Sequence, residues 1–173
     1  MFYLARVVIV IFTITFSCHA ENYITYPLSI KTCPVDGPNP VDLNLSLDSD
    51  GLSFTTELNR NLHENCTYQN DIDVWNGLWV PYVKPKGKAC ASLEQTIRPA
   101  WERFKSAINP KIEDGCNIKP GSYSLSGFKV GKDEFAIPIS STGKFRSIIN
   151  LYCDDEQVGC IEAEMQIEED EEE

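Results

Sequence analysis

Apolar and polar residues alternate with a period of two over much of the chain, which is the pattern of half-buried β-strands. From 41 to 47 every odd position is Val or Leu and every even position is polar. The segment Asp48-Ser49-Asp50-Gly51 then supplies turn residues, and 52–58 has the composition of a returning strand. These signals predict a β-hairpin.

The same alternation returns after Cys116. It covers Tyr123–Val130, Phe135–Ile139, Phe145–Cys153 and Val158–Ile167. From 161 to 167 the odd positions are apolar and the even positions are Glu or Gln, which is typical of an antiparallel strand with one face in solvent.

A helical period interrupts the strands between 92 and 108. The apolar residues there are spaced by four, four, three and four, and they are Leu93, Ile97, Trp101, Phe104 and Ile108. Ser92 with Gln95 can form a capping box at the helix start, and Pro99 should kink or restart the helix. With about seven to nine strands and this one helical segment, we predict an all-β fold, an antiparallel β-sandwich or β-cup.

The N-terminal twenty residues have the layout of a secretory signal peptide. Arg6 precedes the apolar run Val7–Phe16, and small residues around Ala20 suit cleavage there. The run is too short for a bilayer of about 30 Å. A lipidated Cys18 is the alternative, but the residues before it fit that signal poorly. We expect a secreted, extracellular protein with one domain over 21–167 and an acidic tail over 168–173.

Charge excludes one class of partner. The chain has a net charge of −11, and removing residues 1–20, which hold one of the 15 basic and none of the 26 acidic residues, leaves −12. Six of the acids form the tail 168–173, a solvated segment that could also dock a basic partner. The domain alone then carries −6, with no basic patch for nucleic acid.

The cysteines point to an oxidising compartment. Six follow the signal peptide, an even number that predicts three disulfides with 15 connectivities, and they are Cys33, Cys66, Cys90, Cys116, Cys153 and Cys160. Asn44 and Asn65 begin sequons and are candidate glycan acceptors.

Catalytic and metal signals are weak. His63 is the one histidine beyond the signal peptide, and it has no nucleophile motif beside it. A zinc site lacks its usual ligands, and no other metal or cofactor is indicated. The acids that could serve a glycosidase lie in polar runs and are Asp71, Asp73, Asp154 and Asp155.

A calcium loop is also disfavoured. The third, fifth, sixth and twelfth positions of an EF-hand loop would be Asp48, Asp50, Gly51 and Glu57. However, the first ligand position holds Ser46, and both flanks have strand patterns where an EF-hand requires helices. We expect no enzyme.

Several segments together resemble the lysosomal ganglioside-activator protein and its invertebrate relatives in the ML lipid-recognition superfamily. They are Thr32–Leu47, Gly77-Leu78-Trp79-Val80, Cys90 with the helix after it, Cys116–Leu125, Thr142–Arg146 and Val158-Gly159-Cys160-Ile161. The resemblance implies a β-cup that holds acyl chains, makes transient membrane contact and presents lipid to a hydrolase, without catalysis of its own. The resemblance also makes the lysosome a possible location for this protein. Arthropod relatives are linked to contact chemosensation, which adds a receptor as partner.

The resemblance also implies two disulfides, Cys33–Cys160 and Cys90–Cys116. Cys66–Cys153 follows by exclusion. Proximity alone would favour Cys153–Cys160 as a hairpin staple, closing a shorter loop.

The sequence allows two interpretations of the aromatic residues. In a carrier of glycolipid, fatty acyl chain or similar apolar ligand, the candidate contacts are Trp79, Trp101, Phe104, Phe135, Phe145 and Met165. In a secreted chemosensory or protein-interaction module without transported lipid, the same side chains fill a solid core.

We predict that the exported protein begins at Glu21, because the small residues around Ala20 suit signal peptidase. N-terminal sequencing of secreted material measures this directly. A mature protein that retains residues 1–20 would contradict the prediction.

Overall fold

The computed structural model describes residues 23–38, 40–96, 98–113, 116–129 and 141–169. The strands in this part of the chain are β1 (Tyr23–Thr32), β2 (Asp42–Asp48), β3 (Gly51–Leu58), β4 (Thr67–Trp75), β5 (Trp79–Val83), β6 (Lys86–Lys88), β7 (Gly121–Phe128), β8 (Gly143–Cys153) and β9 (Glu156–Glu169). The helices are α2 (Ala89–Thr96) and α3 (Arg98–Ala107). The disulfide-bonded, antiparallel all-β fold is confirmed.

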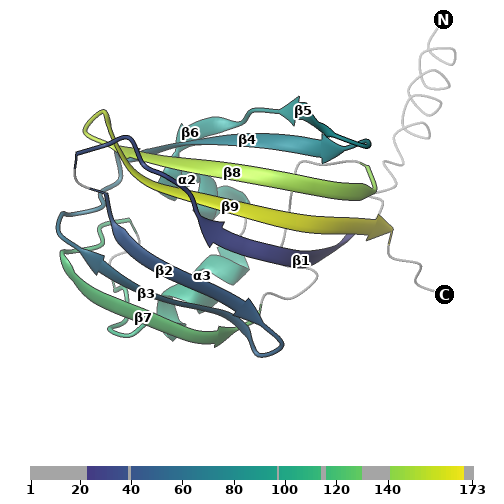
Figure 1. Cartoon of the computed structure of the whole chain (residues 1–173). Coiled ribbons are helices and arrows are strands. Elements are labelled where there is room, and N and C mark those ends of the chain that lie inside the picture. The colour runs from purple at the N-terminus through teal and green to yellow at the C-terminus, as the bar shows by residue number, and fades with distance from the viewer. Residues whose placement is uncertain (1–22, 39, 97, 114–115, 130–140, 170–173) are drawn as a thin grey trace, which may run out of the picture.

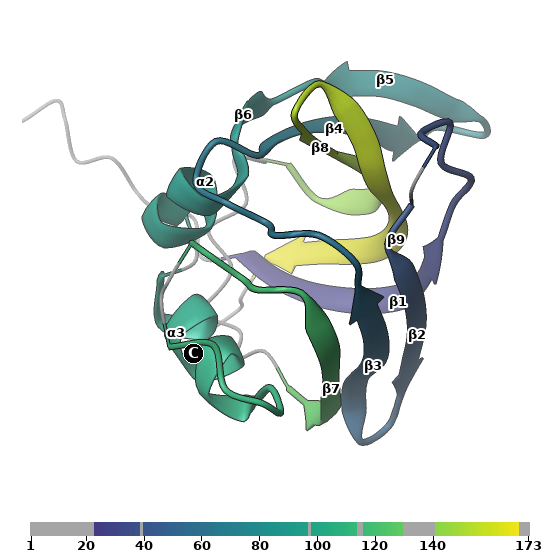
Figure 2. The ribbon, with the colours of Figure 1, turned by 90° about the vertical axis from the view of Figure 1, so that its left-hand side faces the viewer.

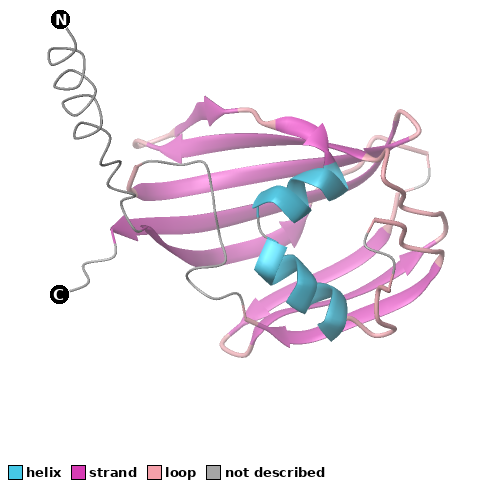
Figure 3. Ribbon diagram, turned by 180° about the vertical axis from the view of Figure 1, so that it is seen from behind, coloured by secondary structure: helices cyan, strands magenta, loops and turns pink. Residues whose placement is uncertain are grey.

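Two sheets face each other. The larger has the order β1-β9-β8-β4-β5, with β6 also paired to β4, and the smaller has the order β2-β3-β7 (Figure 1). Viewed from the end, the sheets come together along β1 and β2, and the helices lie on the opposite side between β6 and β7 (Figure 2). Both helices cover this open side (Figure 3). The sheets and helices thus surround a common interior.

Turn chemistry explains both tight hairpins. The amide of Asp50 donates to Asp48 Oδ1 over 2.8 Å, so the carboxylate holds the β2–β3 turn. Between β8 and β9, Asp154 and Asp155 have φ of 52° and 63°. Two consecutive left-handed residues form the turn that matches the right-handed twist of paired strands. The hairpin predicted at 48–51 is confirmed.

The helical region differs from expectation at its start. Helix α2 begins at Ala89, so Ser92 and Gln95 lie inside it and the predicted capping box at the helix start is wrong. The chain enters the helix straight from β6, and the amide of Ala89 donates to the Cys66 carbonyl over 2.9 Å. Pro99 occupies the second residue of α3, consistent with a restart there.

The three disulfides are Cys33–Cys160, Cys66–Cys153 and Cys90–Cys116, as the resemblance and exclusion predicted. They join residues separated by 127, 87 and 26 positions in the sequence. The first ties the end of β1 to β9, where the Cys33 amide also donates to the Cys160 carbonyl over 3.1 Å. Three disulfides are typical of extracellular proteins.

Other sequence predictions lie outside the described residues. These are the signal peptide 1–20, Ile97 of the helical stripe, the strand Phe135–Ile139 and the end of the acidic tail. Within the described ranges, no helix has the length and apolar character to cross a membrane.

We predict that Gly37→Ala destabilises the protein by about 1–3 kcal/mol, the usual cost of forcing atoms into a packed site. A Cβ at Gly37 would overlap the carbonyl oxygen of Gln157 at the start of β9. The matched control is Gly87→Ala, whose Cβ would lie 3.5 Å from Ser92 Oγ, an ordinary contact. Urea unfolding of both variants checks the difference, and equal midpoints would contradict it.

Candidate functional site

The inward face of the large sheet carries one small packed cluster. Its buried members are Ile72, Phe145 and Ile167, with Phe145 0% exposed. The register places Phe145 between Val74 and Met165 on the neighbouring strands. Phe145 and Met165, both predicted contacts, are therefore brought together here.

A second cluster joins α3 to the small sheet. Phe104 is its centre, with ring centroids 5.5 Å from Trp101, 5.9 Å from Phe54 and 5.5 Å from Phe128. Ile108 and Leu125 complete the cluster as buried residues. Aromatic pairs contribute about 0.5–1.5 kcal/mol each beyond area burial, so they fix the orientation of α3. Trp101 and Phe104 are thus together, but in a different cluster from Phe145.

Hydrogen bonds also hold this helix. Beyond its end, Asn109 and Ser124 of β7 exchange backbone hydrogen bonds of 2.8 and 2.9 Å. At the other end of the helical region, Cys116 is disulfide-bonded to Cys90 of α2. The aromatic side chains of α3 are therefore presented from a fixed backbone.

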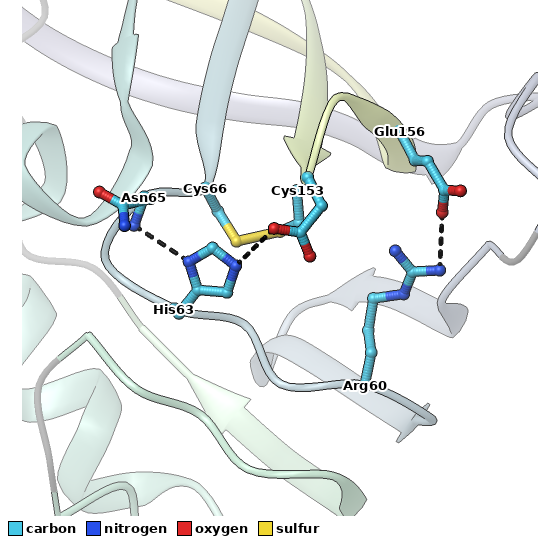
Figure 4. Close-up of a disulfide and its surroundings, with 7 residues drawn as sticks. Arg60, His63, Asn65, Cys66, Cys153 and Glu156 are labelled. Carbon is cyan, nitrogen blue, oxygen red and sulfur yellow. Dashed lines mark hydrogen bonds and ion pairs between the residues drawn. A yellow bond between two sulfur atoms is a disulfide. The ribbon is translucent and has the colours of Figure 1, made fainter.

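A third cluster closes one end of the molecule around the Cys66–Cys153 disulfide and Val158. Beside it, His63 Nδ1 accepts from the Asn65 amide over 3.2 Å, and Nε2 lies 3.2 Å from Asp154 Oδ1 (Figure 4). Because Nδ1 accepts, the neutral ring carries its proton on Nε2 and donates to Asp154. Neither nitrogen is free to act as a base toward a nucleophile in this arrangement.

Between these clusters the inward-facing aliphatic residues are only half-buried. Ile149 and Ile161 pair across β8 and β9, and Ser147 pairs with Ala163 one row away. Ile149, Ile161 and Ala163 all keep part of their surface exposed, as do Leu43, Leu45 and Leu47 on β2. Compact domains commonly have one contiguous buried core, whereas the described residues form three separate clusters. The side chains of the described residues therefore fill this interior incompletely.

One polar pair lies on this inward face. Ser147 is buried, and its hydroxyl donates to Asn70 Oδ1 over 2.7 Å. A buried hydroxyl without a partner would cost about 1–3 kcal/mol, so Asn70 allows Ser147 to lie beside Phe145.

The edge strand β5 extends the apolar surface outward. The Tyr82 ring is 5.5 Å from the Phe145 ring, although Tyr82 is 42% exposed. Val80 also faces inward, because it pairs with Val74. The sequence analysis missed both residues as contacts, although they alternate with Pro81 in the sequence.

The structure does not bring Trp79 to the interior. Trp79 pairs with Trp75 on the outward face, where Arg146 and Lys144 lie 4.8 and 5.4 Å from the Trp79 ring centroid. Both cations also form ion pairs, Arg146 with Asp73 and Lys144 with Glu164, each at 2.6 Å. This face is a charged, solvated surface. Phe135, the remaining predicted contact, lies outside the described residues.

The remaining sites have plain structural roles. Cys90, Glu94 and Cys116 lie close enough to suggest a metal site, but the disulfide occupies both sulfurs. Asn44 and Asn65 are exposed, so both sequons are accessible, and Asn65 accepts a hydrogen bond from Lys88.

Comparison of the sequence with protein-family models and with curated proteins gives no match.

We predict that two isoleucines on the inward face differ sharply in their contribution to stability. Ile72→Ala should cost about 2–5 kcal/mol, because Ile72 is 4% exposed in a packed cluster. Ile149→Ala should cost about 1 kcal/mol or less, because its side chain is not fully packed. Urea unfolding measures both, and equally large losses would mean that the interior is solid.

Proposed function

We propose that this protein is a secreted, non-catalytic carrier that holds an apolar ligand between its two sheets. The observation that carries the proposal is the half-burial of Ile149, Ile161 and Ala163 between three separate clusters. A glycolipid, a fatty acyl chain or a similar molecule has the chemistry to complete this apolar surface.

The physical driving force is burial of apolar area. Removing apolar surface from water contributes roughly 25 cal/mol per Å², from the ligand as well as from the protein. Packing contacts add to this because side chains beside unfilled space lack partner atoms. A flexible hydrocarbon chain can follow an irregular interior, whereas a rigid polar metabolite would leave its hydrogen bonds unmade.

Exposed apolar side chains at one edge support transient contact with a membrane surface. Leu78 is 63% exposed in the β4–β5 turn, and Val80 on the adjoining strand is 38% exposed. Tyr82 links this edge to Phe145. Ligand could pass between the membrane and the interior along these residues. Presentation to a hydrolase or a receptor is part of the proposal and rests on the sequence resemblance.

Export is supported by the disulfides and by the exposed sequons. Disulfides persist in oxidising compartments, and a lysosomal location also suits the proposal. The extracellular space and the lysosome both follow the secretory route on which a signal peptide at 1–20 would place the chain.

We predict that Ala163→Phe blocks uptake of diphenylhexatriene, an apolar fluorescent probe, without unfolding the protein. The new ring would enter space that the ligand uses. Fluorescence titration of the purified protein should show affinity for the probe reduced at least about tenfold, the loss expected when about 1.4 kcal/mol of apolar contact is removed.

Gln166→Phe is the matched control, since residue 166 lies on the outward face of the same strand. It should leave probe affinity unchanged. Native mass spectrometry of the wild type should show copurified lipid. The carrier proposal fails if the wild type takes up no apolar probe and carries no lipid, an outcome that favours the interaction module with a solid core.

A further inference from the structure

Asn70 presents an amide group to the space between the two sheets. The register pairs Asn70 of β4 with Ile149 of β8, so both side chains lie on the inward face of the large sheet. On the other side of β4, the backbone amide of Asn70 donates to the Pro85 carbonyl over 2.9 Å. Asn70 is half-buried although hydrogen-bonded backbone flanks it on both sides. The exposed part of its side chain therefore opens inward, beside the half-buried Ile149.

Ser147 determines which end of the Asn70 amide faces this space. Its hydroxyl donates to Asn70 Oδ1 over 2.7 Å, so the acceptor end of the amide is used within the protein. The Nδ2 end has no hydrogen-bond partner among the described residues. It is also accessible, because the fully buried unpaired atoms of these residues are Arg60 Nε and Trp101 Nε1. A ligand in the interior can therefore reach the Asn70 donor.

A second polar group lies on the same face of β4. Tyr68 pairs with Leu151, so it is the next inward-facing residue along the strand from Asn70. Tyr68 is half-buried, and its hydroxyl remains accessible without a hydrogen bond to a described residue. Successive residues on one face of a strand are about 7 Å apart, so two hydrogen bonds of about 2.8 Å from one ligand atom can bridge the two side chains.

The wall around Asn70 carries no charge. The described inward-facing residues around it on β4, β8 and β9 are uncharged, and they are Tyr68, Ile72, Ser147, Ile149, Ile161 and Ala163. The ion pairs Asp73–Arg146 and Lys144–Glu164 lie on the outward face of the same strands. A carboxylate or phosphate beside Asn70 would lose its hydration without gaining a cation. The ligand group that fits here is therefore uncharged.

We propose that Asn70 and Tyr68 form an interior site for a single hydroxyl group on the hydrocarbon chain of the ligand. The inference rests on the proposed carrier function and makes a long-chain alcohol the ligand class, with its polar end inside the protein. Asn70 Nδ2 donates to the ligand oxygen, and the ligand hydroxyl donates to the Tyr68 oxygen.

This arrangement discriminates against other lipids. An ester or ether oxygen can accept from Asn70, but it has no proton to donate to Tyr68. A glycolipid headgroup would bring many hydroxyls to a wall that offers partners for one, and each unpaired hydroxyl would be costly to bury. Asn70 is then a specificity-determining residue, while the apolar walls bind the chain.

The experiment compares dodecanol with dodecane as competitors for bound diphenylhexatriene. The two compounds differ by one hydroxyl group. In the variant Asn70→Leu/Ser147→Ala both members of the polar pair become apolar, so neither is left without its partner. The matched control is Gln69→Leu, which removes an amide from the outward face of the same strand.

The ratio of the dodecanol affinity to the dodecane affinity should fall about tenfold in the double variant, as expected when the ligand hydroxyl loses a buried hydrogen bond. Comparing this ratio between proteins cancels the cost of removing each compound from water. The Gln69→Leu control should keep the wild-type ratio. Tyr68→Phe should weaken binding of dodecanol but not of methyl undecyl ether, which cannot donate.

Two results would overturn the inference. One is a wild-type ratio in the double variant, and the other is an equal loss of dodecanol and ether binding in Tyr68→Phe. In both cases the carrier function still stands, because apolar compounds bind. If the double variant does not fold, Tyr68→Phe decides alone, since it removes one oxygen from a half-buried residue. If the wild type binds neither compound nor the probe, the carrier function fails and the inference fails with it.

Discussion

The three disulfides supply ties between the strands of a fold that has no continuous packed core among its described residues. Cys66–Cys153 lies in the cluster that closes one end, Cys33–Cys160 joins β1 to β9, and Cys90–Cys116 fixes the helical side. Cross-links over such separations raise the free energy of the unfolded chain, by a few kcal/mol each on the loop-entropy account. That contribution does not depend on filling the interior. Covalent ties at the margins therefore make a partly filled centre compatible with a stable fold.

Strand periodicity predicted the sheets well because burial on one face constrains every second residue. Phe145, Ile149 and Leu151 share the inward face as expected, and Glu162 and Glu164 lie outward in ion pairs with lysines. Periodicity was less informative where apolar residues run together. In Leu78-Trp79-Val80 the sequence does not indicate which face each residue takes, and pairing with Trp75 puts Trp79 outward. Two cations cover its ring, so a large aromatic residue is accommodated on a charged surface.

The sequence predicted the apolar face of the helix but not how the helix is joined to the rest of the fold. The spacing of Trp101, Phe104 and Ile108 gave the packed face correctly, since all three lie in or beside buried clusters. The start at Ala89 depends on β6 and on the hydrogen bond to the Cys66 carbonyl, which are tertiary features. The sequence also could not show that the buried Trp101 Nε1 has no hydrogen-bond partner, because satisfaction of a donor depends on which acceptors the fold places around it. Grouping of the aromatics into separate clusters is likewise a property of the assembled sheets.

Under the proposed carrier function, the distribution of packing indicates which parts of the wall can move to admit a ligand. Ile149, Ile161 and Ala163 lie on β8 and β9, and each of these strands is hydrogen-bonded to a neighbour on both sides. Their backbone is therefore fixed, and the surface they offer exists before any ligand arrives. Among the described strands β5 pairs only with β4, so displacing it breaks one ladder instead of two. Since Tyr82 and Val80 on β5 are both exposed and adjacent to the Phe145 cluster, this edge strand with a single ladder also carries an apolar path inward.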